Sequence, residues 1–177
     1  MIVVVAGVAG SGKTTVGQLL AGRLAWMFAD GDSFHPAVNV AKMRAGLPLT
    51  DADREPWLAA IGSWMDDVIS SGQSAVLACS ALKRRYRDEL LSGREQAEMV
   101  FLIISRADDE ARVASRTGHF FAEPLLASQY ADLELPTADE RVHQVTVGQH
   151  TAGQVAAEIV KLLGLVPADG QSGRGPR

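Results

Sequence analysis

One stretch near the amino terminus has the residue types and spacing of a phosphate-binding loop. Gly7-Val8-Ala9-Gly10-Ser11-Gly12-Lys13-Thr14 matches G-x-x-x-x-G-K-[ST] at every fixed position. Glycines let backbone N–H groups turn toward a phosphate, the lysine reaches the β- and γ-phosphates, and the threonine hydroxyl can bind Mg²⁺. A glycine-rich turn that binds nothing is the weaker alternative. We therefore predict an ATP site formed by Gly7, Val8, Ala9, Gly10, Ser11, Gly12, Lys13, Thr14 and Thr15, with Lys13 also catalytic.

Two carboxylates, Asp30 and Asp32, stand at the end of a second predicted strand over 26–32. In open α/β sheets, ligands bind beyond the carboxyl ends of the strands, so we expect both acids beside the phosphate loop. One of them can orient Mg²⁺ through water, and the other can accept the proton of an acceptor hydroxyl. The third strand ends at Cys79-Ser80 without an aspartate, which leaves this pair as the best source of a carboxylate. Two solvated loop acids are the alternative.

A pair of arginines is expected on a lid. Arg112 and Arg116 are four residues apart, hence on one helical face, and they lead into a stretch that contains Gly118. Arginine binds phosphate in a bidentate way, and a closing lid would bring both side chains to the transferred phosphate. We predict a lid at about 112–123, with Arg112 and Arg116 catalytic. An ordinary charged surface is the alternative.

The other chemically active side chains divide into site candidates and structural residues. His35 and His119 fall in loops around the predicted site, so we expect them to contact the substrate. The histidines do not have metal-ligand spacing. The structural group comprises Cys79 as a small buried residue, Arg85 and Arg87 on a solvated helix face, and His143 and His150 as bystanders.

Alternating strands and helices are expected to position these residues. β-Branched apolar runs predict strands, and apolar residues spaced three and four apart predict helices. Asp53 is the expected N-cap of the longest helix, with Pro56 in its first turn. This order predicts an α/β fold, the three-layer αβα P-loop kinase fold, with a parallel sheet of about five strands. Strands are predicted at 2–6, 26–32, 74–79, 99–104 and 142–147, and helices at 14–24, 38–45, 54–71, 82–91, 108–116, 124–133 and 152–163.

Two of these helices have predicted inward faces. The first is expected to bury Val16, Leu19, Leu20 and Leu24, and the last, capped by Thr151, to bury Val155, Ile159, Leu162 and Leu163.

The composition is that of one globular domain. Of the 177 residues, 47% are hydrophobic and 21% are charged. We assign 1–167 to a kinase domain that includes the lid, and 168–177, rich in Gly, Ser, Pro and Arg, to a disordered tail. A net charge of −4 argues against a nucleic-acid partner. No stretch approaches the roughly 18 apolar residues of a membrane span. The single cysteine cannot form an internal disulfide, so we expect a cytoplasmic protein without a membrane partner.

Longer motifs resemble one family. Asp30-Gly31-Asp32-x-x-His35-Pro36-x-x-Asn39-x-x-Lys42-Met43-x-x-Gly46-x-Pro48-Leu49-x-Asp51-x-Asp53-Arg54-x-Pro56-Trp57-Leu58 is similar to gluconokinases of the P-loop kinase superfamily nearly position for position. Cys79-Ser80-Ala81-Leu82-Lys83-x-x-Tyr86-Arg87-Asp88, Gly118-His119-Phe120-Phe121 and Leu126-x-Ser128-Gln129 resemble later blocks of the same family. The resemblance covers about 2–165. It implies transfer of the ATP γ-phosphate to the 6-hydroxyl of D-gluconate, by a homodimer.

The resemblance also implies roles for single residues. Asp32, His35, Arg54 and the turn from Ser80 to Lys83 would line the acceptor site, and Arg112, Arg116 and His119 would belong to the lid. A similar D-x-D in shikimate kinases favours Asp30, with Thr14, on the metal side and Asp32 on the acceptor side.

The residues alone leave the acceptor open. Another small acid, such as a different aldonate or shikimate, or a nucleoside monophosphate remains possible on this basis. A non-catalytic nucleotide-gated binding protein is the alternative of a different class, and it would need neither the two carboxylates nor an arginine lid.

Overall fold

The computed structural model describes the backbone of residues 1–114 and 123–168 and the side chains of 1–110 and 126–168. The strands are β1 (Ile2–Ala6), β2 (Met27–Asp30), β3 (Ala75–Cys79), β4 (Ala97–Ile103) and β5 (Val142–Thr146). They form one sheet in the order β2-β3-β1-β4-β5, and every pairing is parallel. All strands therefore point their carboxyl ends toward the same edge. The predicted parallel five-stranded sheet is confirmed.

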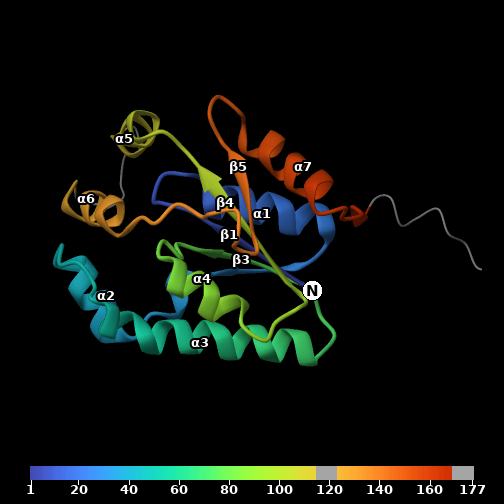
Figure 1. Ribbon diagram of the computed structural model, residues 1–177, viewed down its shortest axis with the longest axis horizontal. Coiled ribbons are helices and arrows are strands. Elements are labelled where there is room, and N and C mark those ends of the chain that lie inside the picture. Colours follow the sequence, from blue (N-terminus) through green and yellow to red (C-terminus); the bar gives the residue numbers. More distant parts are fainter. Residues whose placement is uncertain (115–122, 169–177) are drawn as a thin grey trace, which may run out of the picture.

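Some helices cover the two faces of this sheet, and others lie at its carboxyl edge. The helical elements are α1 (Lys13–Leu24), the 3-10 helix η1 (Gly31–Phe34), α2 (Ala37–Arg44), α3 (Asp51–Ser70), α4 (Arg84–Leu91), α5 (Arg106–Ala114), α6 (Glu123–Asp132) and α7 (Ala152–Leu162). Helices α1 and α7 lie on one face and α3 and α4 on the other, whereas α2, α5 and α6 stand at one end (Figure 1). Within the described residues, no helix has the length and apolar character to cross a membrane.

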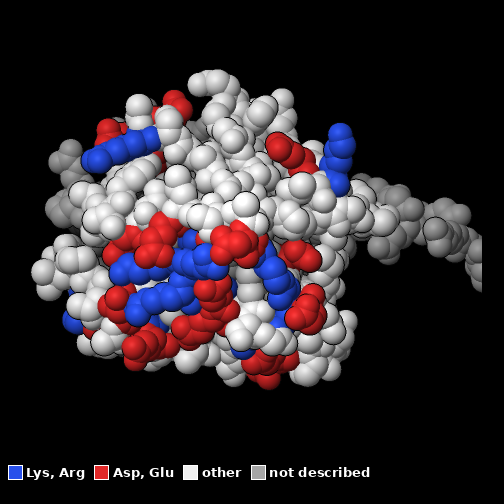
Figure 2. Space-filling model, viewed as in Figure 1, with Lys and Arg blue, Asp and Glu red and all other residues white. Residues whose placement is uncertain are grey.

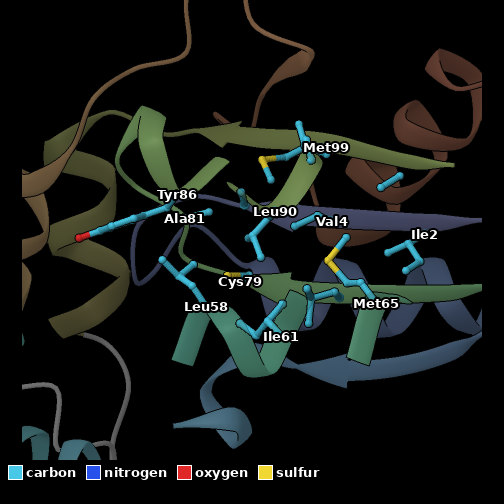
Figure 3. Close-up of a cluster of buried hydrophobic side chains, with 14 of the residues drawn as sticks. Ile2, Val4, Leu58, Ile61, Met65, Cys79, Ala81, Tyr86, Leu90 and Met99 are labelled. Atoms are coloured by element: carbon cyan, nitrogen blue, oxygen red, sulfur yellow. The ribbon is translucent and has the colours of Figure 1, made fainter. Parts of the chain in front are cut away.

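Alternating residues of β1 supply both halves of the core. Ile2 and Val4 pack with Ile61 and Met65 of α3 and with Leu90 of α4 (Figure 3). On the other face, Val3 and Val5 pack against the apolar sides of α1 and α7. Because β1 is buried on both faces, its carboxyl end is held firmly where the phosphate loop begins.

The apolar faces of the outer helices differ from the predictions at two positions. Leu19 of α1 is 41% exposed and Leu162 of α7 is 46% exposed, so both predictions of an inward side chain are wrong. The alanines Ala21 and Ala156 are buried on these helices. Leu20 and Ile159 lie in the core between these helices and the sheet, and the small alanines complete the buried faces in place of Leu19 and Leu162.

The start of α3 also differs from the prediction. Thr50 is the N-cap and Asp53 is the third helical residue: the Thr50 hydroxyl accepts the Asp53 N–H at 3.2 Å, and the Asp53 carboxylate accepts the Thr50 N–H at 2.8 Å. This reciprocal pair satisfies two donors, which a cap at Asp53 would leave to water. Pro56 consequently lies inside the helix and not in its first turn.

Charged side chains of both signs interleave on the face formed by α3 and α4 (Figure 2). Arg85 belongs to this face and pairs with Asp51. Arg87 does not, because its side chain is fully buried and pairs with Glu140. The prediction of a solvated face is therefore wrong for Arg87. Its helix position looked like part of a basic stripe, but that side of α4 is covered by the segment before β5.

Candidate active site

A pocket of about 270 Å³ opens at the carboxyl edge of the sheet, where ligands of α/β proteins bind. It is lined by side chains from η1, α2, α3 and α6 and from the end of β3. Four of the predicted acceptor residues are among them: Asp32, His35, Arg54 and Ser80. The lining also includes Val40, Met43, Arg44, Pro48, Leu49, Trp57, Ser128 and Gln129.

The phosphate loop adjoins this pocket, between β1 and α1. At Gly7 the backbone has a φ of +141°, and an added Cβ would lie 2.9 Å from the Ser11 hydroxyl oxygen and 3.0 Å from the Leu102 carbonyl oxygen, so only glycine fits. Ser11 is buried, and its hydroxyl donates to the Val8 carbonyl at 2.8 Å. The Gly7 N–H donates to the Ser80 carbonyl at 3.3 Å, which ties the loop to this pocket.

Lys13 is the charged group of this loop. Its Nζ donates to the Val8 carbonyl oxygen at 2.9 Å, so the ammonium group lies over the loop itself. Burial lowers the pKa of Lys13, and the carboxylate of Asp32 opposes that shift most strongly among the nearby charges. The phosphate loop and the pocket therefore share one electrostatic environment.

Asp30 joins the phosphate loop to the acceptor side. Its Oδ2 accepts a hydrogen bond from the Thr14 hydroxyl at 3.2 Å, and its Oδ1 accepts the N–H of Asp32 at 3.1 Å. Strand β2 ends at Asp30, so the prediction of a strand through residue 32 is wrong at its end. Asp30 instead caps η1, and that tight turn gives the two carboxylates different surroundings.

Glycine is required within this turn. An added Cβ on Gly31 would lie 2.8 Å from the Ala78 carbonyl oxygen, too close for any other residue. The Gly31 carbonyl accepts the Trp57 indole N–H at 2.7 Å. Strand β3 and helix α3 thus hold Asp32 in place from both sides.

Asp32 has the electrostatic character of a proton acceptor. Burial raises the pKa of its carboxyl group, Lys13 opposes the shift, and Asp30 adds to it. A raised pKa makes the ionised carboxylate a stronger base. Asp30, bonded to Thr14 and to a backbone N–H, is fixed as an acceptor.

The oxygens of Thr14 and Asp30 suit Mg²⁺, which prefers hard oxygen ligands and keeps several waters. They are already 3.2 Å apart. Within the described residues, no group of three His, Cys, Asp or Glu side chains could hold a metal ion by itself. A Mg²⁺ ion here would therefore depend on phosphate oxygens and water for its remaining ligands, as it does in other phosphoryl-transfer sites.

His35 forms one wall of the pocket as a neutral ring. Its ring stacks on Trp57 with the centroids 4.6 Å apart. Burial, helped by the charge of Arg54, lowers the pKa of His35 to about 4. Asn39 Nδ2 donates to the Asp53 carbonyl and lies 3.5 Å from His35 Nδ1, which places the acceptor nitrogen there and the ring proton on Nε2. His35 can therefore donate a hydrogen bond without bringing charge.

Arg54 is held in the pocket wall by an ionic network. Its Nη2 lies 2.9 Å from Asp132, and Lys83 bridges Asp132 at 3.1 Å and Asp51 at 2.9 Å. Tyr86 donates its hydroxyl to Asp51 and accepts from Arg54. Lys83 is thus beside the pocket but not among its lining residues, and of the predicted turn from Ser80 to Lys83 only Ser80 lines it.

The predicted lid falls largely outside the described residues. Arg116 and His119 lie outside them entirely, and for Arg112 only the backbone, in α5, is described. Cys79 is buried at the end of β3, which confirms the prediction of a small buried residue, and burial raises its pKa to about 12. His143 pairs with Glu98 across β4 and β5, at 3.2 Å and away from the pocket.

Sequence reasoning missed several residues of the pocket wall. Trp57, Ser128 and Gln129 fall within the motifs that resemble the family, but their residue types alone do not indicate a role in the site. Asp132 had no local signal, because its partners Arg54 and Lys83 are distant in the sequence.

The parallel sheet, the phosphate loop and the pocket beside it define a P-loop kinase. A family model described as an AAA domain matches residues 2–133. A gluconokinase from Gluconobacter oxydans (strain 621H) is 48% identical over 147 residues, which cover 83% of each chain. The chain belongs to the gluconokinase family.

Two solved structures agree with this assignment. A sugar kinase from Janibacter sp. HTCC2649 superposes with a TM-score of 0.86 at 39% identity, over 94% of this chain and 96% of that one. A gluconokinase from Sinorhizobium meliloti 1021 superposes with a TM-score of 0.76 at 40% identity, over 91% and 94%.

Proposed function

We propose that this protein transfers the γ-phosphate of ATP to the 6-hydroxyl of D-gluconate and releases ADP and 6-phosphogluconate. The observation that supports this most directly is the position of Asp32, which lines the acceptor pocket and shares its electrostatic environment with Lys13 of the phosphate loop. A hydroxyl placed between these two groups has a base on one side and a bound phosphate on the other. Family membership supplies the identity of the acceptor.

In the proposed mechanism, residues 7–15 bind the phosphates and Lys13 neutralises the charge that develops on them. The acceptor oxygen forms its bond to the γ-phosphorus as the bond between that phosphorus and the β,γ-bridging oxygen breaks. Asp32 takes the proton of the hydroxyl. Thr14 and Asp30 would hold Mg²⁺, whose charge, when bound, helps to neutralise the phosphates.

The acceptor is oriented by groups of matching chemistry. Arg54 presents a guanidinium group, which suits the carboxylate of a sugar acid, and its Asp132 and Tyr86 partners fix its direction. His35 donates to a hydroxyl, and Ser80 can do the same. Lys83 would act on the acceptor through its charge, from beside the pocket.

Further parts of the proposal follow from the sequence and the family. Arg112, Arg116 and His119 act from a lid at about 112–123 within a kinase domain of residues 1–167, and 168–177 form a disordered tail. The protein works as a cytoplasmic homodimer without a membrane or nucleic-acid partner. Hydrogen exchange over 112–123, with ATP and gluconate together, tests the lid, and light scattering tests the dimer.

The decisive experiment measures ADP release with Mg²⁺-ATP and a panel of acceptors: gluconate, other aldonates, shikimate and nucleoside monophosphates. We expect turnover with gluconate to exceed turnover with every other member, and the product to be phosphorylated at O6. Preference for another acceptor would reject the substrate assignment but not the kinase. Nucleotide binding without phosphorylation of any acceptor would favour a binding protein.

A further inference from the structure

Helix α6 connects the phosphate loop with the acceptor pocket through one side chain. The Gln129 Oε1 accepts a hydrogen bond from the backbone N–H of Ala9 at 2.6 Å. Gln129 also lines the acceptor pocket, together with Asp32 and Arg54. Gln129 thus contacts the phosphate loop and also borders the pocket.

The Ala9 N–H belongs to the loop whose backbone N–H groups cradle phosphates. A backbone N–H that donates a short hydrogen bond to a side chain is not available to a phosphate oxygen at the same time. A phosphate seated against Ala9 therefore competes with the Gln129 carboxamide.

Once it no longer accepts the Ala9 N–H, the Gln129 carboxamide can form hydrogen bonds with another ligand. It carries one acceptor oxygen and two N–H donors, which match the hydroxyl groups of a polyol. The helix itself is tied down one turn later, where Asp132 pairs with Arg54 at 2.9 Å and with Lys83 at 3.1 Å. Residues 129 and 132 share a helix face, so the anchor holds α6 at the pocket while the glutamine side chain rotates.

We infer that Gln129 is a binding residue shared by the two substrates. It holds the Ala9 N–H until a phosphate displaces it, and the freed carboxamide then binds a hydroxyl group of the acceptor. Nucleotide and acceptor binding are coupled in this way. The inference rests on the proposed function for the acceptor but not for the competition at Ala9.

Gln129→Leu tests both halves, because leucine has a similar size and cannot hydrogen-bond. We expect a non-hydrolysable ATP analogue with Mg²⁺, titrated alone by calorimetry, to bind about threefold to tenfold more tightly, the worth of one net hydrogen bond. The KM for gluconate should rise by a similar factor. A loosened structure would weaken both ligands, so opposite signs distinguish binding from a structural role.

Two further variants complete the design. Gln96→Leu is the matched control, since Gln96 is exposed at the amino end of β4, at the opposite edge of the sheet, and both constants should stay unchanged. Gln129→Ala repeats the test if the leucine variant does not fold. Analogue affinity that is unchanged or weaker, or an unchanged KM for gluconate, would overturn the inference. If the wild-type protein does not phosphorylate gluconate, the proposed function fails, yet the analogue titration still decides the competition at Ala9.

Discussion

Arg87 and Glu140 form a buried, two-pronged ion pair that joins α4 to the segment before β5. Arg87 Nε and Nη2 lie 2.7 and 3.0 Å from the two Glu140 carboxylate oxygens, and the side chains are 0% and 2% exposed. Arg87 Nη1 also donates to the carbonyl oxygens of Leu82 and Glu134. The pair therefore fixes the turn that follows Ser80, and Ser80 itself lines the pocket.

Removing one partner of this pair should destabilise the fold. We expect Arg87→Met to lower the free energy of unfolding by roughly 3 to 5 kcal/mol, because a buried carboxylate and several carbonyls lose their donor. Urea denaturation measures the effect. Arg85→Met is the matched control on the exposed side of α4, with an expected change below about 1 kcal/mol. Equal effects would mean that burial does not matter.

The same pair predicts a pH dependence of stability. Hydrogen bonds from Arg87 lower the pKa of Glu140 below its ordinary value of 4.5, so protonation favours the unfolded chain. The contribution is complete above that ordinary value and is lost as the pH falls through the folded pKa. Unfolding curves of wild type and Glu140→Gln should therefore differ most near neutral pH and converge in acid. A constant difference would contradict this.

Lys13→Ala should remove activity and leave the fold intact, because this ammonium group serves the phosphates and is not part of the apolar core. Loss of a preorganised charge is worth on the order of 10²- to 10³-fold in kcat. Steady-state kinetics measure it, with thermal unfolding as the check on folding. A folded variant with near-native turnover would reject the role of Lys13.

Asp32→Asn should lower kcat for gluconate by roughly 10²- to 10⁴-fold and leave ATP affinity nearly unchanged, since the amide keeps the shape but accepts no proton. Because burial raises the pKa of Asp32 in the free enzyme, the acid limb of the wild-type kcat/KM profile should lie above the ordinary aspartate value of 3.8. Activity rises with pH through that limb, as the carboxylate ionises. An unchanged kcat would rule out the base, and a higher KM alone would indicate a binding role.

Arg54→Gln should raise the KM for gluconate by about 10- to 100-fold, the worth of a charge-assisted hydrogen bond, with little change in the KM for ATP. Arg85→Gln is the control, because Arg85 shares Asp51 with this network but lies outside the pocket. Kinetics with each substrate varied in turn separate the two constants. A rise in both would show that Arg54 serves the fold and not the acceptor.

The sequence by itself determined the local parts of this protein. The phosphate loop lies in consecutive residues, so its turn chemistry could be predicted from the pattern of glycines, Lys13 and Thr14. The order of strands and helices followed from periodicity, and the parallel sheet followed from their alternation. Asp30 and Asp32 were expected beside the loop because parallel strands share one carboxyl edge.

The tertiary structure alone decided which distant groups meet. Arg87 looked like part of a solvated basic stripe, and only Glu140, 53 residues later, gives it a buried partner. The Gln129 carboxamide reaches Ala9 across 120 residues, and no local pattern encodes that distance. The periodicity of polar and apolar residues predicts which face of a helix or strand is buried. It does not predict which residues from distant parts of the chain contact a given side chain. Burial and ion pairing depend on packing between elements, and the roles of Arg87, Gln129 and Asp132 emerged only from the folded chain.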